Sequence, residues 1–134
     1  MRRIDHIGVA VPDLEAALAP YVEGLGIQVA RREDVATERV RIAMLPVGET
    51  NIELLEPTDP ESPIAKFIER RGPGIHHIAL AVDDIEATME RMRAAGVRMI
   101  DETPRTGAGG TRVAFAHPKA FQGVLVELVE GGHH

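Results

Sequence analysis

Large apolar residues recur at alternate positions in two segments of the chain that lie 71 residues apart. The first segment ends with Ile7, Val9 and Val11, and the second ends with Ile78, Leu80 and Val82. In both segments the residues between them are glycine or alanine. An alternation with a period of two predicts β-strands whose two faces meet different surroundings. Both strands are followed by residues with a helical period, which predicts a helix after each strand.

The first half of the chain predicts one strand, one helix and three further strands. The first strand covers residues 3–11. Asp13 is placed to cap a helix over residues 14–23, and Pro20 should kink or shorten that helix. The remaining strands are predicted near residues 27–34, 39–46 and 50–56.

A proline-rich linker at residues 57–61 leads to the pair Ser62-Pro63, which is typical of a helix start. That helix is expected to end at Gly72. The second half then repeats the first, with a helix over 84–95 and strands at 75–82, 97–100, 112–117 and 124–130. Residues 101–111 are expected to form a long, glycine-rich loop, and residues 131–134 a frayed tail.

These elements predict an α+β fold made of two tandem βαβββ modules. The modules span about 3–57 and 74–130, and the linker and helix at 58–73 join them. We expect residues 1–134 to form a single domain in which the two modules share a core.

The duplication also repeats two residue types that bind metals. His6 recurs as His77, and Glu53, in an apolar strand, recurs as Glu127. Two imidazoles and two carboxylates form a complete set of protein ligands for a divalent ion. A single strand histidine is more often packed or exposed, and a single strand glutamate more often faces solvent, but repetition in register favours a metal site.

The neighbours of these residues support the same interpretation. The face that carries each histidine has only small residues, which leaves space beside the imidazole. A glutamate directed inwards from an apolar strand is costly unless a partner neutralises it. A metal ion is one such partner, and an arginine or an outward-facing position are the alternatives.

Composition excludes several classes of function. The 134 residues carry a net charge of −6 with dispersed basic residues, so we expect no nucleic-acid partner. No apolar run approaches the ~20 residues that span a membrane, and the chain begins directly with a strand. There is no cysteine, which excludes a disulfide framework and thiol chemistry. We expect a cytoplasmic protein without a membrane partner.

The order His, Glu, His, Glu in a duplicated βαβββ module resembles the vicinal oxygen chelate superfamily, which includes glyoxalase I and extradiol dioxygenases. Within it, the chain looks most like the methylmalonyl-CoA epimerases. The stretches that carry this resemblance span nearly the whole chain: residues 4–11, 47–57, 62–67, 74–79, 117–119 and 123–128.

The resemblance implies a curved mixed sheet around a metal cleft, usually in a homodimer. Its implied metal ligands are His6, Glu53, His77 and Glu127. The implied cofactor is a divalent ion, with Co²⁺ favoured and Mn²⁺, Ni²⁺, Zn²⁺ or Mg²⁺ as alternatives. The implied reaction interconverts the (R) and (S) epimers of methylmalonyl-CoA by abstraction of the α-proton through an enolate.

Some relatives carry a glutamate where this chain has Ile42, and a glutamine where it has Glu53. We therefore hypothesise that Glu53 and Glu127 are the two catalytic acid/base groups, because inversion at carbon needs one on each side. The coenzyme A portion is expected to meet loops, with His117, Lys119, Gly109 and Gly110 as candidate substrate contacts.

Three other functions use similar residues. A glyoxalase I-type lyase would use the same four ligands on a hemithioacetal. An iron dioxygenase generally needs only two histidines and one carboxylate, so the fourth ligand argues against it. A metal-free binding protein of the resistance type needs aromatic walls, and this chain has no tryptophan and only 4 other aromatic residues (1 Tyr and 3 Phe).

Overall fold

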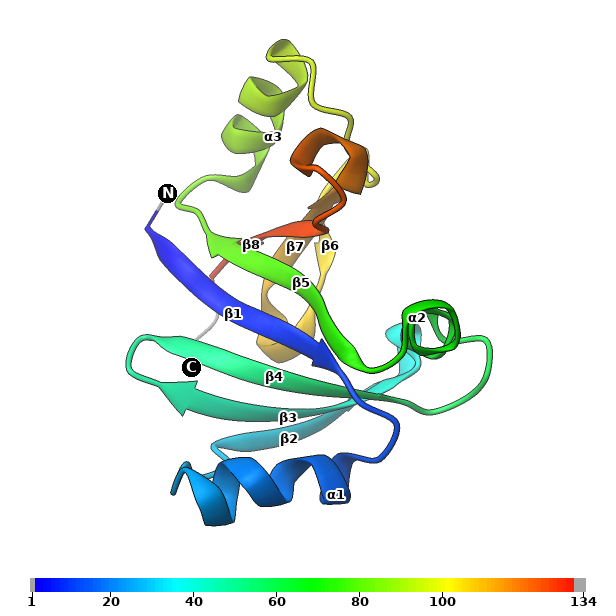
Figure 1. The fold of residues 1–134 in the computed structure, drawn as a ribbon. Helices are drawn as coiled ribbons and strands as arrows, with labels where there is room; N and C mark the ends of the chain where they lie inside the picture. The colour runs from blue at the N-terminus through cyan, green and yellow to red at the C-terminus, as the bar shows by residue number, and fades with distance from the viewer. Residues whose placement is uncertain (1, 132–134) are drawn as a thin grey trace. The chain divides into compact units, whose positions relative to one another are not determined.

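The structure is a computed structural model that describes residues 2–131, so residues 132–134 of the expected tail lie outside the described part (Figure 1). The chain divides into two compact units. One consists of residues 7–76, and the other of residues up to 6 together with those from 77 onwards. Strands β1 (Arg3–Ala10) and β5 (Gly74–Ala81) each contribute residues to both units.

In the unit of residues 7–76, the strands lie in the order β1-β4-β3-β2. β2 (Arg31–Val35) pairs antiparallel with β3 (Val40–Val47), and β3 pairs antiparallel with β4 (Thr50–Pro57). The turn at Gly48, with φ of 61°, joins β3 to β4 in a tight hairpin.

Helix α1 (Leu14–Ala19) covers one face of this sheet. Asp13 caps it by accepting the backbone N–H of Ala16. Leu14 and Leu18 pack against Leu45 and Leu54 in the core of the unit. The predicted effect of proline is confirmed, because α-helical bonding stops at Ala19 and a π-helical turn, Pro20–Gly24, replaces it.

Helix α2 (Pro63–Arg71) also begins as predicted. The hydroxyl of Ser62, which is fully buried, accepts the N–H of Ile64, and proline occupies the first helical position. The helix ends at Gly72, whose φ of 79° suits glycine.

The other unit contains β5, β8, β7 and β6 in that order. β5 pairs parallel with β8 (Val126–Glu130), which pairs antiparallel with β7 (Arg112–Ala116), and β7 pairs antiparallel with β6 (Arg105–Thr106). Helix α3 (Ile85–Ala94), capped by Asp84, buries Ile85 and Met89 against Leu128. The strand–helix–three-strand succession of each half is therefore confirmed, and the fold is α+β.

Two predicted strands were wrong in part. Residues 27–30 are not a strand, because the N–H of Ile27 bonds to Tyr21 O and closes the π-helical turn. Residues 97–100 form only an isolated bridge from Met99 to Ala116. The second strand of the second half is instead β6, which lies inside the segment expected to be a loop.

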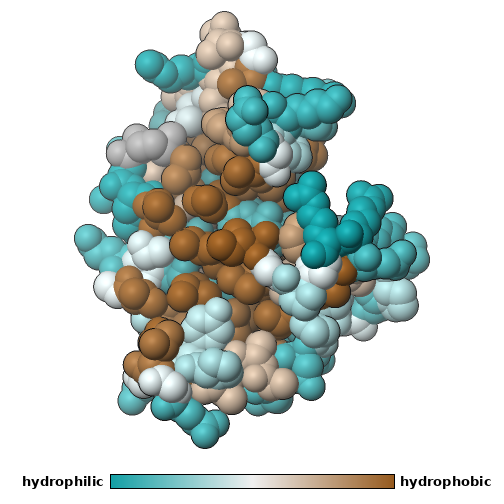
Figure 2. Space-filling model, viewed as in Figure 1, coloured by the Kyte–Doolittle hydropathy of each residue, from teal (hydrophilic) through white to brown (hydrophobic). Residues whose placement is uncertain are grey.

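Apolar side chains also reach the surface, as the face drawn in Figure 2 shows. Among the described residues, the large apolar side chains that are exposed are Ile4, Val22, Leu25, Val47, Ile75, Ile100 and Val124. In the described part of the chain, residues 2–131, no helix is long and apolar enough to cross a membrane.

Candidate metal centre

Three of the four predicted ligands lie together in one unit of the chain. His6 is on β1, His77 on β5 and Glu127 on β8. Parallel pairing of β5 with β8 places Ala79 opposite Glu127, so the carboxylate is next to the strand that carries His77. All three side chains are buried, with 5–7% of each residue exposed.

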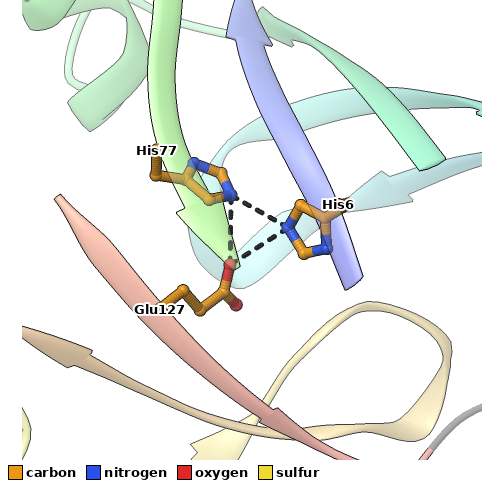
Figure 3. A group of neighbouring side chains, drawn as sticks. All are labelled: His6, His77 and Glu127. Carbon is orange, nitrogen blue, oxygen red and sulfur yellow. Dashed lines mark hydrogen bonds and ion pairs between the residues drawn. The ribbon is translucent and has the colours of Figure 1, made fainter. Parts of the chain in front are cut away.

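The ligating atoms of these residues form a nearly equilateral triangle (Figure 3). His6 Nε2 is 3.0 Å from His77 Nε2 and 3.1 Å from Glu127 Oε1. His77 Nε2 is 3.0 Å from the same carboxylate oxygen. The imidazole planes are nearly perpendicular, at 88°, and both rings direct Nε2 into the triangle.

The protonation of His6 shows why a cation fits this triangle. His6 Nδ1 lies 2.8 Å from Asp5 Oδ2, and because an ionised carboxylate only accepts, Nδ1 carries the proton. In neutral His6, Nε2 then offers a lone pair to Glu127 Oε1, which also offers only lone pairs. A proton on Nε2 or a cation shared by all three atoms removes this repulsion.

The edge lengths of the triangle suit a shared divalent ion. Bonds from such an ion to nitrogen and oxygen ligands are about 2.0–2.2 Å long, so its ligands lie roughly 3 Å apart. The observed separations of 3.0–3.1 Å are of this size. The residues present therefore fit a divalent metal site.

Two opposing effects act on the carboxyl group of Glu127. Burial alone would raise its pKa, but hydrogen bonds with His6 and His77 and their charges lower the pKa to about 2. Glu127 is thus ionised, which is the form that binds a cation. Its second oxygen points away from both imidazoles (Figure 3).

Glu53 lies in the other unit, on β4, and only 4% of it is exposed. Ile52 and Leu54, on either side of it, pack in the core beneath α1, so Glu53 faces away from that helix. Glu127 likewise lies next to Leu128, which packs beneath α3. The two glutamates therefore hold equivalent places in their units, each on the sheet face opposite the covering helix.

Ile42, which replaces a glutamate of some relatives, shares this face with Glu53. Ile42 pairs with Leu55, and Met44 pairs with Glu53. The side chains of paired residues, and of residues two apart on a strand, lie on the same face, so these four share one face of the β3–β4 pair. Ile42 is 6% exposed, so this chain has an apolar, buried residue there.

One expectation about the surroundings of the histidines was wrong. The small residue Ala79, beside His77, does not leave open space, because it is fully buried against Val113 and Val129. Neighbouring strands fill the volume that alanine vacates. The face that carries the ligands continues as a packed apolar layer.

The candidate coenzyme A contacts lie on two turns. His117 Nδ1 accepts the N–H of Lys119 and caps the short 3-10 turn Pro118–Phe121, so the imidazole has a local structural role. Lys119 is exposed. Gly109 and Gly110 lie between β6 and β7 with φ of 69° and 76°, conformations that favour glycine.

Two neighbours of the triangle were not predicted from the sequence. Asp5 bonds to His6, and its only sequence signal was a charged residue directly before the repeated histidine. Phe115 contacts the edge of the His77 ring, with centroids 5.8 Å apart, and the guanidinium of Arg105 lies 5.3 Å from the Phe115 centroid. Only the fold brings Phe115, 38 positions later in the chain, to His77.

Comparison with known proteins places these residues in a family context. Residues 5–115 match the family model described as the glyoxalase/bleomycin resistance protein/dioxygenase superfamily. The chain is 44% identical to the ethylmalonyl-CoA/methylmalonyl-CoA epimerase of Cereibacter sphaeroides, over 94% of this chain and 96% of the relative.

Two solved structures are similar over nearly their whole length. The crystal structure of methylmalonyl-CoA epimerase from Mycobacterium tuberculosis has 41% identity and a TM-score of 0.93, covering 98% of this chain and 89% of that chain. A methylmalonyl-CoA epimerase in complex with methylmalonyl-CoA and NH4+ has 39% identity and a TM-score of 0.94, with coverage of 98% and 95%.

Proposed function

Because the chain belongs to the glyoxalase/bleomycin resistance protein/dioxygenase superfamily and, within it, to the methylmalonyl-CoA epimerases, we propose that it interconverts (R)- and (S)-methylmalonyl-CoA. It is thus an enzyme of the isomerase class. The observation that carries the proposal is the buried triangle of His6, His77 and Glu127 in a chain that is 44% identical to a curated epimerase.

The proposed metal ligands are His6, Glu53, His77 and Glu127, with a divalent cation as cofactor. The separations of 3.0–3.1 Å within the triangle support a shared divalent ion. Imidazole and carboxylate donors suit Co²⁺, which we favour, with Mn²⁺, Ni²⁺, Zn²⁺ or Mg²⁺ as alternatives. Glu53 completes the set through its equivalent place on β4.

The reaction removes the hydrogen between a thioester carbonyl and a carboxylate and returns one to the opposite face. A bound divalent cation would supply electrostatic stabilisation of the negative charge that develops on the thioester oxygen. Inversion needs two groups that exchange protons with the α-carbon, one on each side. We assign these roles to Glu127, ionised and with one oxygen turned away from the imidazoles, and to Glu53.

The buried isoleucine at position 42 supports the role of Glu53. A base at position 42 is excluded in this chain, and Glu53 is the carboxylate on the same face of the β3–β4 pair. For the coenzyme A portion, we propose contacts with the exposed Lys119, with the turn at Gly109 and Gly110, and with the ring of His117.

The reaction itself is tested by proton exchange at the α-carbon. In deuterated water, the metal-loaded protein should introduce deuterium into each epimer of methylmalonyl-CoA, which NMR detects. The same protein is then given the hemithioacetal of methylglyoxal and glutathione. If the protein consumed the hemithioacetal and introduced no deuterium into methylmalonyl-CoA, its activity would be that of a glyoxalase I-type lyase and not that of an epimerase.

The two-glutamate scheme is tested by Glu53→Gln, with Glu56→Gln as a matched control on the same strand. Glu56 pairs with Arg41 and is not assigned to the site. We expect Glu53→Gln to reduce epimerisation by at least about 100-fold, since acid–base groups contribute about 10²–10⁴-fold, and Glu56→Gln to retain it. Full turnover of Glu53→Gln with unchanged metal content would contradict the scheme.

A homodimer in the cytoplasm belongs to the same proposal. Leu25, 69% exposed, and Ile75, 64% exposed, are apolar side chains that a second copy of the chain would cover in such a dimer. Light scattering on the purified protein should give twice the mass of 14.5 kDa. A mass of one chain at micromolar concentration would contradict the dimer.

A further inference from the structure

We infer that Asp5 is a positioning residue for the metal centre, which holds His6 as the Nδ1–H tautomer with Nε2 directed at His77 and Glu127. The inference rests on the metal site of the proposed function. Asp5 lies outside the proposed ligand set, and its contacts and its burial support this role.

The contact between Asp5 and His6 is unusual for consecutive residues of a strand. Neighbouring side chains of β1 point to opposite faces, yet Asp5 Oδ2 lies 2.8 Å from His6 Nδ1. The two side chains are thus in contact although the alternation of the strand would separate them. This contact fixes both the tautomer and the orientation of the imidazole.

Burial makes this contact strong. Asp5 is 1% exposed and His6 is 5% exposed, so little water competes for the hydrogen bond. Arg3, which shares the face of Asp5, donates to Asp5 Oδ1 over 3.3 Å and is one-third exposed. The guanidinium thus places a positive charge beside the buried carboxylate and helps to orient it.

The internal repeat shows that this arrangement belongs to one half of the site. The 71-residue offset that relates His6 to His77 places His76 where the first half has Asp5. His76 packs edge-on against Phe67, with ring centroids 4.9 Å apart. The residue before the ligand has thus diverged between the halves, to a carboxylate in one and an imidazole in the other.

A carboxylate on the far nitrogen of a ligand histidine has two effects on metal binding. It presents the lone pair of Nε2 to the ion, and it makes the imidazole a better electron donor. Removing such a partner typically weakens metal binding by 10-fold to 100-fold. We expect the effect to appear in metal affinity before it appears in stability of the fold.

The first test measures the tautomer in the protein freed of metal by a chelator. Long-range ¹H–¹⁵N NMR of ¹⁵N-histidine protein distinguishes Nδ1–H from Nε2–H rings, and the spectrum of His6→Gln identifies the signals of His6. We expect Nδ1 of His6 to carry a proton in the wild type, and in Asp5→Ala we expect the ring to lose it and to keep only the proton on Nε2. An unchanged tautomer in Asp5→Ala would overturn the inference.

The second test measures Co²⁺ binding from the visible absorption of the ion, which also reports its coordination geometry. Asp5→Asn keeps the shape of the side chain and removes its charge, so it is the deciding variant. We expect its dissociation constant to rise about tenfold, that of Asp5→Ala to rise up to about 100-fold, and the absorption band to change. Asp84→Asn is the matched control, since asparagine also caps a helix and Asp84 caps α3.

The outcomes separate this inference from the proposed function. If the wild type binds one Co²⁺ and Asp5→Asn binds it with the same affinity and spectrum, the inference is wrong and the metal site stands. If the wild type binds no divalent ion, both are wrong. Weaker binding in Asp5→Asn but not in Asp84→Asn supports the inference.

Discussion

Glu127 shows how neighbours determine the chemistry of one residue. Burial disfavours the charge of its carboxylate, and the two imidazoles more than compensate, so its pKa is about 2. A carboxylate that is both buried and ionised must have a cationic partner. The same group is therefore prepared to bind a metal ion.

Glu127→Gln should remove the negative charge that binds the metal ion, with little change in side-chain volume. Because loss of a residue that only supports a ligand weakens metal affinity by 10-fold to 100-fold, we expect loss of a ligand to weaken it by more than about 100-fold. Titration with Co²⁺ measures this, and Glu130→Gln on the same strand is the control, because Glu130 bonds to Ile85 and Arg112 instead. Equal affinity in Glu127→Gln and the wild type would exclude Glu127 as a ligand.

The low pKa of Glu127 also predicts how stability depends on pH in the metal-free protein. The pKa falls from 4.5 to about 2 on folding, so between these values the unfolded chain binds more protons. The stabilisation, roughly 3 kcal/mol, is present above pH 4.5 and is lost as pH falls towards 2. Urea unfolding measures the free energy of unfolding of the wild type and of Glu127→Gln at pH 7 and at pH 3. The difference between the two proteins should be smaller at pH 3. An equal difference at both pH values would contradict this prediction.

The residues of the triangle were visible in the sequence because duplication repeated them, whereas the residues that contact them were not. His6 and His77 share a pattern at a fixed offset. Asp5 breaks that pattern, and its contact with His6 depends on a side-chain rotation that alternation along a strand does not predict. The interaction of Phe115 with His77 depends on strand pairing distant in sequence.

At the scale of elements, capping residues determine where the helices begin. Asp13 and Asp84 hold equivalent places in the two halves, and each accepts a backbone N–H three residues later. Sequence pattern predicted these starts because capping is a local interaction.

Asp84→Ala should therefore lower the free energy of unfolding by about 1 kcal/mol, and Asp84→Asn by much less. Denaturant unfolding of both variants measures the difference. Equal losses in the two variants would show that the charge of Asp84, and not its capping bond, stabilises α3.

One element that the sequence placed wrongly is the second strand of the second half. The N–H of Ile100 bonds to Phe115 O, but the N–H of Phe115 goes to the carboxylate of Asp101, so the ladder stops after one bridge. A side chain that competes for a backbone N–H is not visible in the alternation of residues. β6 forms further along, at Arg105–Thr106, on the other side of this interruption.

At the scale of the whole chain, the duplication explains both the fold and the placement of the site residues. The order β1-β4-β3-β2 in one unit corresponds to β5-β8-β7-β6 in the other. Cross-strand pairs are repeated as well, since Arg41 pairs with Glu56 and Arg112 with Glu130. The fold class was predictable because each half repeats the same local signals, whereas strand ends and support residues depend on tertiary contacts.

A metal bound only to the folded state should stabilise the molecule. At a Co²⁺ concentration of 100 times the dissociation constant, the gain is about 2.7 kcal/mol, or a rise in Tm on the order of 10 °C. Calorimetry of the chelated and Co²⁺-loaded protein measures this rise, and His77→Ala should abolish it. An equal rise in His77→Ala would place the ion at another site.

The dependence of catalysis on a single ion is tested most directly by restoring activity to chelated protein. Deuterium exchange into methylmalonyl-CoA is measured by NMR as Co²⁺ is added in steps. We predict almost no exchange at the start and a rate that increases linearly up to one ion per chain and then remains constant. Full exchange in the chelated protein, before any ion is added, would contradict the account.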